Sequence, residues 1–226
     1  MTVVVVTGGT RGIGQGLVRA FAAQGASVAF CGRTVAEVPE GTLGVTADVT
    51  NRADVRKLWD ATVDRFGRVD IWVNNAGMST GRAPLWQLPP DEIDQVVYLN
   101  LRGTLHASAV VLDAMLTQGH GALWNMEGLG SNGQIVPGLT AYGATKRALT
   151  YATLAMAKEL KDTPVKVALL SPAWSSPTCS PTTTTRPSSR RRRRSSTSSP
   201  TGSRPSPRGS PPGCSPAPGT AGGWPG

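Results

Sequence analysis

The chain has 226 residues, enough for one α/β domain, and its formal net charge is +9. The charge is uneven: residues 1–172 hold 15 Lys and Arg against 14 Asp and Glu, whereas residues 173–226 hold eight Arg and no acidic residue. The nearly neutral part gives no electrostatic reason to expect nucleic acid or an anionic membrane as a partner. It contains one cysteine, Cys31, and its first apolar run is too short to span a bilayer. We therefore expect a reduced, cytoplasmic protein.

Short apolar runs alternate with helical stretches along residues 1–172, which predicts a parallel sheet with interleaved helices. The predicted strands are residues 2–6, 27–31, 43–47, 69–73, 122–126 and 165–170. The predicted helices are residues 13–24, 52–66, 91–101, 105–118 and 141–160, with Asn51 and Asp91 as N-caps. Six strands in this order predict one doubly wound α/β domain, a Rossmann fold, over residues 1–172.

The first predicted strand leads directly into a glycine-rich turn that opens the first helix. Glycine lets the backbone approach a phosphate closely, and the start of a helix offers unpaired N–H groups and a favourable dipole. The order strand, turn and helix is the context that dinucleotide binding requires. The predicted contacts to the cofactor in this turn are Gly8, Thr10, Arg11, Gly12, Ile13 and Gly14.

Arg33 follows the second predicted strand, about twenty residues beyond the glycines. In an NAD enzyme this place holds a carboxylate that accepts hydrogen bonds from the ribose 2′-hydroxyl. The planar guanidinium groups of Arg33 and Arg11 instead match the oxygens of a 2′-phosphate. We therefore expect NADP(H) rather than NAD(H); the alternative is that both arginines are solvated surface residues.

Two further turns fit a cofactor site at the carboxyl ends of the strands. Asp48 and Val49 follow the third strand, where a carboxylate would meet the adenine amino group. Asn75, Ala76 and Gly77 follow the fourth strand. We expect all five residues to contact the cofactor, although an ordinary turn would also explain the second group.

Tyr142 and Lys146 are four residues apart on the last predicted helix, so their side chains share one face. A tyrosine with a pKa of about 10 is a poor proton donor or acceptor at neutral pH. A nearby ammonium group, and the positive charge of an oxidised nicotinamide, would lower that pKa toward the working range. The pair is therefore a candidate acid–base centre that also contacts the cofactor.

In this order, the glycine turn, the Asn-Asn-Ala-Gly turn and the Tyr-x-x-x-Lys pair resemble the short-chain dehydrogenase/reductase family over about three quarters of the chain. The resemblance implies hydride transfer between a nicotinamide cofactor and a carbonyl or alcohol, in a homo-oligomer. It implies that Tyr142 is the general acid/base and that Lys146 holds the ribose and tunes Tyr142. It also implies that Asn100 supports a water of the proton relay.

The catalytic serine of that family departs from its usual spacing. The family places it about thirteen residues before the tyrosine, where this chain has Leu129. Ser131 is the nearest serine, and the resemblance then implies that its hydroxyl polarises the carbonyl; a loop serine without a catalytic role is the alternative. The longer segment before Tyr142 looks like the chlorophyll b reductase branch, which carries Asp at the position of Glu127.

From residue 173 onward every residue is Ala, Trp, Ser, Pro, Thr, Cys, Arg or Gly. These are the eight types whose codons have C or G as the second base, as out-of-frame reading of a GC-rich gene would produce. Without large aliphatic or acidic side chains, residues 173–226 are predicted to form a disordered tail. The alternative is a natural Arg- and Pro-rich tail.

Two other functions stay open on the sequence. The chain is then either an inactive, truncated dinucleotide-binding relic, or a retired scaffold whose arginine run at residues 190–194 binds nucleic acid. No aromatic residues interleave with those arginines to stack on bases. The favoured interpretation is an NADPH-dependent oxidoreductase that acts on a small carbonyl or alcohol, with no specific nucleic-acid or membrane partner and no metal.

Overall fold

Six parallel strands form one sheet in the computed structural model, which describes residues 1–36 and 38–172. The strands are β1 (Val3–Thr7), β2 (Ser27–Gly32), β3 (Leu43–Thr46), β4 (Ile71–Asn74), β5 (Gly121–Met126) and β6 (Val165–Leu170), in the order β3-β2-β1-β4-β5-β6. This arrangement confirms the predicted doubly wound fold; the tail predicted at residues 173–226 lies outside the described residues.

The strand order reverses between β1 and β4, and this reversal determines where a ligand can bind. Both strands pair in parallel with each other, and β1 also pairs with β2. Helices that leave neighbouring strands in opposite directions open a crevice at the carboxyl ends of those strands. The turns after β1 and β4 therefore border the expected cofactor site.

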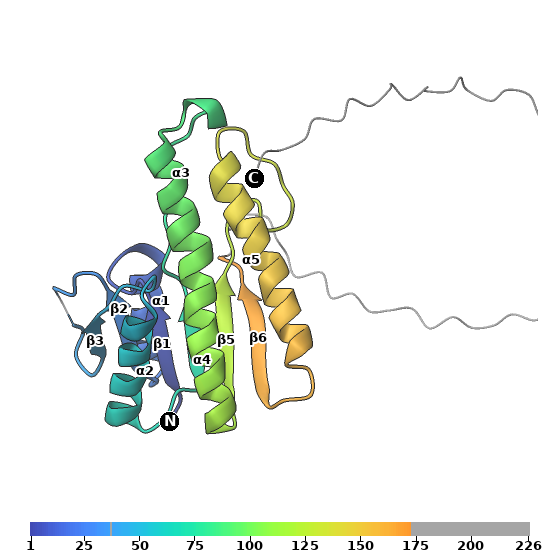
Figure 1. Cartoon of the computed structure of the whole chain (residues 1–226). Helices are drawn as coiled ribbons and strands as arrows, with labels where there is room; N and C mark the ends of the chain where they lie inside the picture. Colours follow the sequence, from blue (N-terminus) through green and yellow to red (C-terminus); the bar gives the residue numbers. More distant parts are fainter. Residues whose placement is uncertain (37, 173–226) are drawn as a thin grey trace, which may run out of the picture. The chain divides into compact units, whose positions relative to one another are not determined.

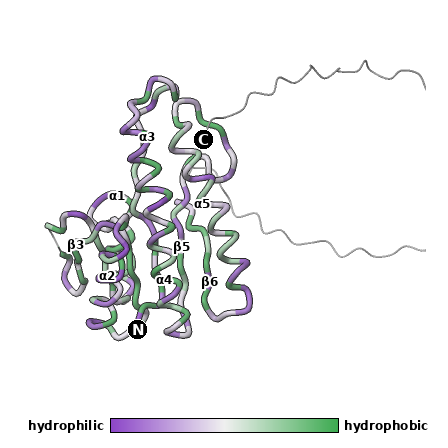
Figure 2. The backbone as a smooth tube through the Cα atoms, in the orientation of Figure 1, coloured by the Kyte–Doolittle hydropathy of each residue, from purple (hydrophilic) through white to green (hydrophobic). Residues whose placement is uncertain are grey.

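Helices cover both faces of the sheet (Figure 1). The helices α2 (Arg52–Phe66), α4 (Thr104–Gln118) and α5 (Thr140–Glu159) pack on one face, around buried Trp72 and Leu123. The helix α1 (Gly12–Ala23) packs on the other face through Val18, against Val4, Val6 and Phe30. Figure 2 shows hydrophobic residues along the inner strands, and burial of this apolar area stabilises the layers.

Two predicted helices are one continuous helical path in the structure. A short turn of 3₁₀ helix, η1 (Leu85–Gln87), precedes α3 (Pro90–Val96), which continues through the π-helical segment η2 (Val97–Gly103) into α4. Gly103 does not interrupt the path because its φ is −59°. A Cβ on Gly103 would lie 3.3 Å from the methyl group of Thr50, so glycine instead lets the helix approach the turn after β3 closely.

One of the two predicted helix N-caps is confirmed and the other is wrong. Asn51 caps α2, and its side chain accepts a hydrogen bond from the N–H of Ala53, as expected. The Asp91 prediction is wrong, because α3 begins at Pro90 and Asp91 lies inside its first turn. Proline is well suited to the first helical position, since its φ is already helical and it has no N–H to satisfy. No helix in the described part of the chain is both long and apolar enough to cross a membrane.

Candidate active site

The glycine turn after β1 has the geometry of a phosphate cradle. Gly8 has a φ of +64° and Gly12 a φ of +56°, which favour glycine over other residues. A Cβ on Gly14 would clash with the carbonyl oxygen of Gly8. Around Gly12, by contrast, nothing lies within 4 Å of the place that a Cβ would take. The turn is thus tightly packed at Gly14, whereas the space beside Gly12 is open.

The N-terminus of α1 completes this cradle. Arg11 is the N-cap, and its side chain does not cap the helix, so the first N–H groups keep their capacity to bind an anion. Thr10 packs on the second strand, because a Cβ on Gly32 would lie 2.7 Å from the Thr10 methyl group. Ile13 is exposed in the first helical turn. The cradle therefore fits the pyrophosphate of a dinucleotide.

Arg11 and Arg33 lie at the same edge of the sheet. Thr7 and Cys31 are register partners in β1 and β2, and the N–H of Gly9 donates to the Cys31 carbonyl over 2.9 Å. Arg33 follows directly after β2, and both arginine side chains are exposed. The structure thus places both residues at the carboxyl ends of β1 and β2, at the glycine turn.

The turn after β4 is tied to the end of β1 by Thr7, a residue that the sequence analysis missed. Its hydroxyl oxygen accepts hydrogen bonds of 3.0 Å from the N–H groups of Asn75 and Ala76. The Asn75 amide donates to the carbonyl oxygens of Thr7 and Gly8 over 2.9 and 3.2 Å. The Asn75 side chain therefore holds the cradle together. A hydroxyl residue at the last position of the first strand was the available signal.

Asp48 and Val49 lie at the turn after β3, as predicted. One Asp48 carboxylate oxygen accepts hydrogen bonds from the N–H and the hydroxyl of Thr50, over 2.9 and 2.7 Å. The Asp48 N–H donates to Asp54 over 2.9 Å. Val49 is buried. Half of the Asp48 carboxylate thus stabilises its own turn, and no hydrogen bond to the second oxygen is present among the described residues.

Tyr142 and Lys146 lie one turn apart in α5. The Lys146 ammonium is 5.9 Å from the centre of the Tyr142 ring and donates to the Met126 carbonyl over 3.1 Å. Burial raises the pKa of Tyr142 above 10 and lowers the pKa of Lys146 to about 8. The expected lowering of the Tyr142 pKa by Lys146 is therefore wrong for the protein's own groups, because loss of hydration outweighs the ammonium charge.

Asn100 lies in η2 and is 1% exposed. Its amide oxygen accepts from the Met78 N–H, and its amide nitrogen donates to the Met78 carbonyl, each over 2.8 Å. The same nitrogen donates to the Thr145 hydroxyl over 3.3 Å. The Asn100 side chain therefore joins the loop after β4 to α5. A Cβ placed on Gly77 would lie 3.1 Å from the Asn100 amide oxygen, so this oxygen lies close to the Gly77 backbone.

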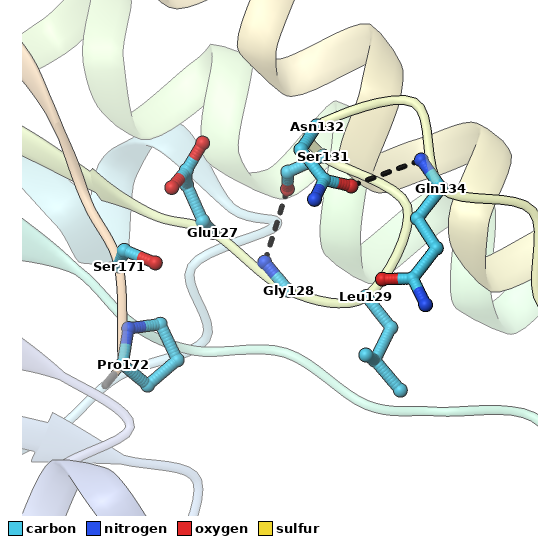
Figure 3. A pocket seen from close by; sticks show the side chains of 8 residues that line it. All are labelled: Glu127, Gly128, Leu129, Ser131, Asn132, Gln134, Ser171 and Pro172. Carbon is cyan, nitrogen blue, oxygen red and sulfur yellow. Dashed lines mark hydrogen bonds between the residues drawn. The ribbon is translucent and has the colours of Figure 1, made fainter. Parts of the chain in front are cut away.

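The residue in contact with the Tyr142 hydroxyl is Gly128. A Cβ on Gly128 would clash with the phenol oxygen, and it would lie 3.1 Å from Lys146 Cε. Ser131 is buried, and its hydroxyl oxygen accepts a hydrogen bond of 3.0 Å from the Gly128 N–H (Figure 3). The spacing argument did not single out Gly128. The signal was its place two residues after the last residue of β5.

Two side chains of α5 fix the backbone of Ser131. Arg147 donates to the Ser131 carbonyl over 2.9 Å, and the Thr150 hydroxyl donates to it over 3.2 Å. The Ser131 N–H closes a turn by donating to the Gly128 carbonyl over 3.0 Å. All three polar groups of Ser131 are therefore engaged in fixing the segment between β5 and α5.

A pocket opens between this segment and the end of β6 (Figure 3). Its lining comprises Glu127, Gly128, Leu129, Ser131, Asn132, Gln134, Ser171 and Pro172. Gly128 belongs both to the lining and to the contact with Tyr142. No cluster of metal-ligating side chains occurs within residues 1–36 and 38–172.

Comparison with known proteins agrees with this geometry. The chain is 34% identical over 176 residues to a chloroplastic chlorophyll(ide) b reductase of Arabidopsis thaliana, covering 72% of this chain and 51% of that protein. It is 41% identical over 184 residues to the L-fucose dehydrogenase of Bos taurus, covering 75% and 64%. The chain thus spans about half to two thirds of the length of these relatives.

Solved structures show the same fold. A 3-ketoacyl-(acyl-carrier-protein) reductase from Brucella melitensis, complexed with NADH, has a TM-score of 0.70 at 30% identity, covering 76% of this chain and 75% of that one. A serine dehydrogenase complexed with NADP+ has a TM-score of 0.70 at 27% identity, covering 75% and 71%. A model of the family described as short chain dehydrogenase matches residues 2–186. The chain therefore belongs to the short-chain dehydrogenase family of oxidoreductases.

Proposed function

We propose that the protein is an NADP(H)-dependent oxidoreductase that interconverts a carbonyl compound and the corresponding alcohol. One observation carries the proposal: Tyr142 and Lys146 meet the end of β5 at Gly128, on the same edge of the sheet as the glycine turn after β1. An acid–base group and a phosphate cradle at one sheet edge suit a reaction that transfers both a proton and a hydride.

The cofactor would be held by the residues of the cradle. The turn at Gly8, Gly12 and Gly14 admits a pyrophosphate at the N-terminus of α1. Arg11 and Arg33 suit a 2′-phosphate, so NADP(H) is preferred over NAD(H). Among the similar structures, the serine dehydrogenase contains NADP+ and the Brucella reductase contains NADH, so both cofactors occur on this fold. When bound, the nicotinamide supplies or accepts the hydride.

The side chains around Gly128 would handle the proton and the carbonyl. Tyr142 donates its phenol proton to the carbonyl oxygen during reduction and takes it back during oxidation. The Ser131 hydroxyl accepts from Gly128, and among the described residues no acceptor takes its own proton, so it is available to polarise the carbonyl. Lys146 holds the ribose and is positioned by the Met126 carbonyl.

Asn100 would act as a positioning residue in the proton path. Both N–H groups of its amide donate, to Met78 and Thr145, whereas its amide oxygen accepts one hydrogen bond from Met78 and can accept a second. These contacts hold η2 against α5, and π-helical turns are frequent at functional sites. Any relay water near Asn100 would therefore have to donate to it, either to the amide oxygen or to the backbone carbonyl.

The relatives offer two candidate substrates. The chlorophyll(ide) b reductases suggest a formyl group on a tetrapyrrole, and L-fucose dehydrogenase suggests a sugar. Both substrates would react at a carbonyl or alcohol group, which the site supports. A homo-oligomeric state and a cytoplasmic location stay predictions.

The test is Tyr142→Phe in the full chain. We expect NADPH-dependent turnover of an aldehyde and ketone panel, followed by absorbance at 340 nm, to fall by at least a thousandfold. NADPH binding, measured by fluorescence titration, should change less than threefold, because the ring still packs while the proton donor is gone. Full activity in the variant would overturn the proposal. NADPH binding without any turnover in the unchanged protein would favour the inactive relic.

A further inference from the structure

Glu127 is a partly buried acidic residue beside the catalytic centre. It follows the last residue of β5, and its N–H donates to the Leu170 carbonyl of β6 over 2.8 Å, which fixes its backbone. Glu127 and Ser171 both line the pocket (Figure 3). Within residues 1–36 and 38–172, no hydrogen bond or ion pair engages the Glu127 carboxylate. A carboxylate that is partly withdrawn from water without a partner is poised to accept a hydrogen bond from a ligand.

The pocket and the Tyr142 hydroxyl share one neighbour, Gly128. Gly128 separates Glu127 from the contact with Tyr142, and it has no Cβ. Adjacent Cα atoms are about 3.8 Å apart, and a glutamate side chain adds reach to that distance. A substrate whose carbonyl lies at the Tyr142 hydroxyl would therefore extend past Gly128 toward the part of the pocket that Glu127 lines.

We propose that Glu127 determines substrate choice by accepting a hydrogen bond from a hydroxyl group on the carbon next to the reacting carbon. The inference rests on the proposed function and names its substrate class, namely 2-hydroxy carbonyl compounds and the corresponding vicinal diols. The neutral polar groups of Asn132, Gln134 and Ser171 line the same pocket and suit further hydroxyls. Among the described residues that line it, the one charged residue is Glu127, which would repel an anionic substrate.

The physical basis of the selection is the penalty for an unpaired carboxylate. A substrate that brings a hydroxyl replaces the water that the carboxylate loses, whereas a substrate with hydrogen at that carbon leaves the charge unpaired. Sites built to bind a substrate hydroxyl discriminate strongly against the analogue that lacks it. We expect a preference of roughly tenfold to hundredfold for the hydroxylated compound, because hydrogen bonds to charged groups are the stronger class.

Three compounds that differ only at the central carbon test the proposal: glycerol, propane-1,3-diol and 2-amino-1,3-propanediol. Their binding to the full chain in the presence of NADP+ is measured by saturation-transfer NMR titration, and their oxidation by NADPH formation. Glycerol should bind about tenfold more tightly than propane-1,3-diol. The proposal is overturned if glycerol and propane-1,3-diol bind equally, or if the ammonium compound, which also donates to a carboxylate, binds no more tightly than propane-1,3-diol.

Glu127→Gln and Glu127→Met should bring the ratio for glycerol over propane-1,3-diol to within threefold. Asp113→Asn is the matched control, because Asp113 is an exposed acid on α4 that pairs with Arg56 of α2 and does not line the pocket, and the ratio should stay unchanged. NADP+ binding verifies that each variant is folded. The binding ratio tests Glu127, whereas turnover tests the proposed function, so the two failures are distinguishable. A preference that survives both substitutions assigns the selection to another group and overturns the proposal.

Discussion

The hydroxyl of Tyr142 and the ammonium of Lys146 both occupy positions with little water. Burial favours the neutral form of each, which raises the pKa of Tyr142 and lowers the pKa of Lys146 to about 8. A phenol that keeps its proton is a competent acid for carbonyl reduction near neutral pH. As a base for alcohol oxidation it requires added positive charge, which an oxidised nicotinamide would supply. At the residue scale, burial therefore keeps the Tyr142 phenol protonated near neutral pH.

A second feature at the residue scale is Arg33, which we expect to determine the preference for NADPH over NADH. The exposed guanidinium after β2 lies at the edge where a ribose would bind, so Arg33→Asp should repel a 2′-phosphate and accept hydrogen bonds from a 2′-hydroxyl. We expect the unchanged protein to bind NADPH at least tenfold more tightly than NADH, and the variant to reverse this order. Fluorescence titration of both cofactors measures the ratio, with Arg19→Asp on the exposed side of α1 as the control. Equal affinities in the unchanged protein would contradict the assignment.

At the scale of elements, the segment between β5 and α5 is fixed by contacts from the helix. Arg147 and Thr150 bind the carbonyl of Ser131, and the hydroxyl of Ser131 binds Gly128, which touches Tyr142. This series of contacts begins at Arg147 and Thr150 and ends at Tyr142, and all three residues belong to α5. The helix therefore positions both the acid–base group and the loop that faces it.

A double-mutant cycle tests whether Arg147 acts through Ser131. Arg147→Met should lower kcat about fivefold to twentyfold, since hydrogen bonds to charged groups are worth more than neutral ones. In the Ser131→Ala background the same change should have less than a twofold effect, because the group that Arg147 positions is already lost. NADPH binding should be unaffected in all four proteins. Independent, multiplicative effects would show that Arg147 supports activity by another route.

At the scale of the whole molecule, the two faces of the sheet are covered unequally by the described residues. On the face with α1, Trp124 of β5 and Leu170 of β6 are partly buried, whereas Trp72 and Leu123 are buried beneath the helices of the other face. Within residues 1–36 and 38–172, α1 is the only helix in that layer. The larger of the two buried clusters in the described part of the chain therefore lies on the face that carries α2, α4 and α5.

Buried Lys146 makes the free energy of unfolding depend on pH. The unfolded chain holds the lysine proton up to about pH 10.4, whereas the folded protein releases it near a pKa of about 8. Unfolding therefore takes up a proton between these values, and stability rises as the pH increases through this window, by roughly 1 kcal/mol per pH unit. Urea unfolding between about pH 7 and 8.5 should show the start of this rise; at higher pH the Cys31 thiol, whose pKa burial raises to about 11, opposes it.

Lys146→Met removes the titrating group and should abolish that slope, whereas Lys158→Met, an exposed lysine near the end of the same helix, should preserve it. A slope that persists in Lys146→Met would assign the pH dependence to other groups. The measurement requires no cofactor or substrate, so it examines the burial of Lys146 independently of the reaction.

The sequence by itself determined the parts of this protein that depend on local pattern. Apolar runs and helical periodicity located all six strands and the main helices, and the order of strand, glycine turn and helix located the cradle at Gly8 to Gly14. The spacing of Tyr142 and Lys146 placed them on one helical face. Each of these signals is contained within about twenty neighbouring residues, and the chemistry of such short segments decides their conformation.

Only the tertiary structure decided which groups meet and how they titrate. Gly128 against Tyr142, Asn100 between Met78 and Thr145, and Thr7 beside Asn75 join residues that are 14 to 68 positions apart. The spacing of serine and tyrosine could not reveal Gly128, because the turn that carries it is shaped by α5. The pair of Tyr142 and Lys146 predicts a lowered tyrosine pKa, yet burial raises the pKa of Tyr142 and lowers the pKa of Lys146. Burial is a property of the packed fold and cannot be read from two residues.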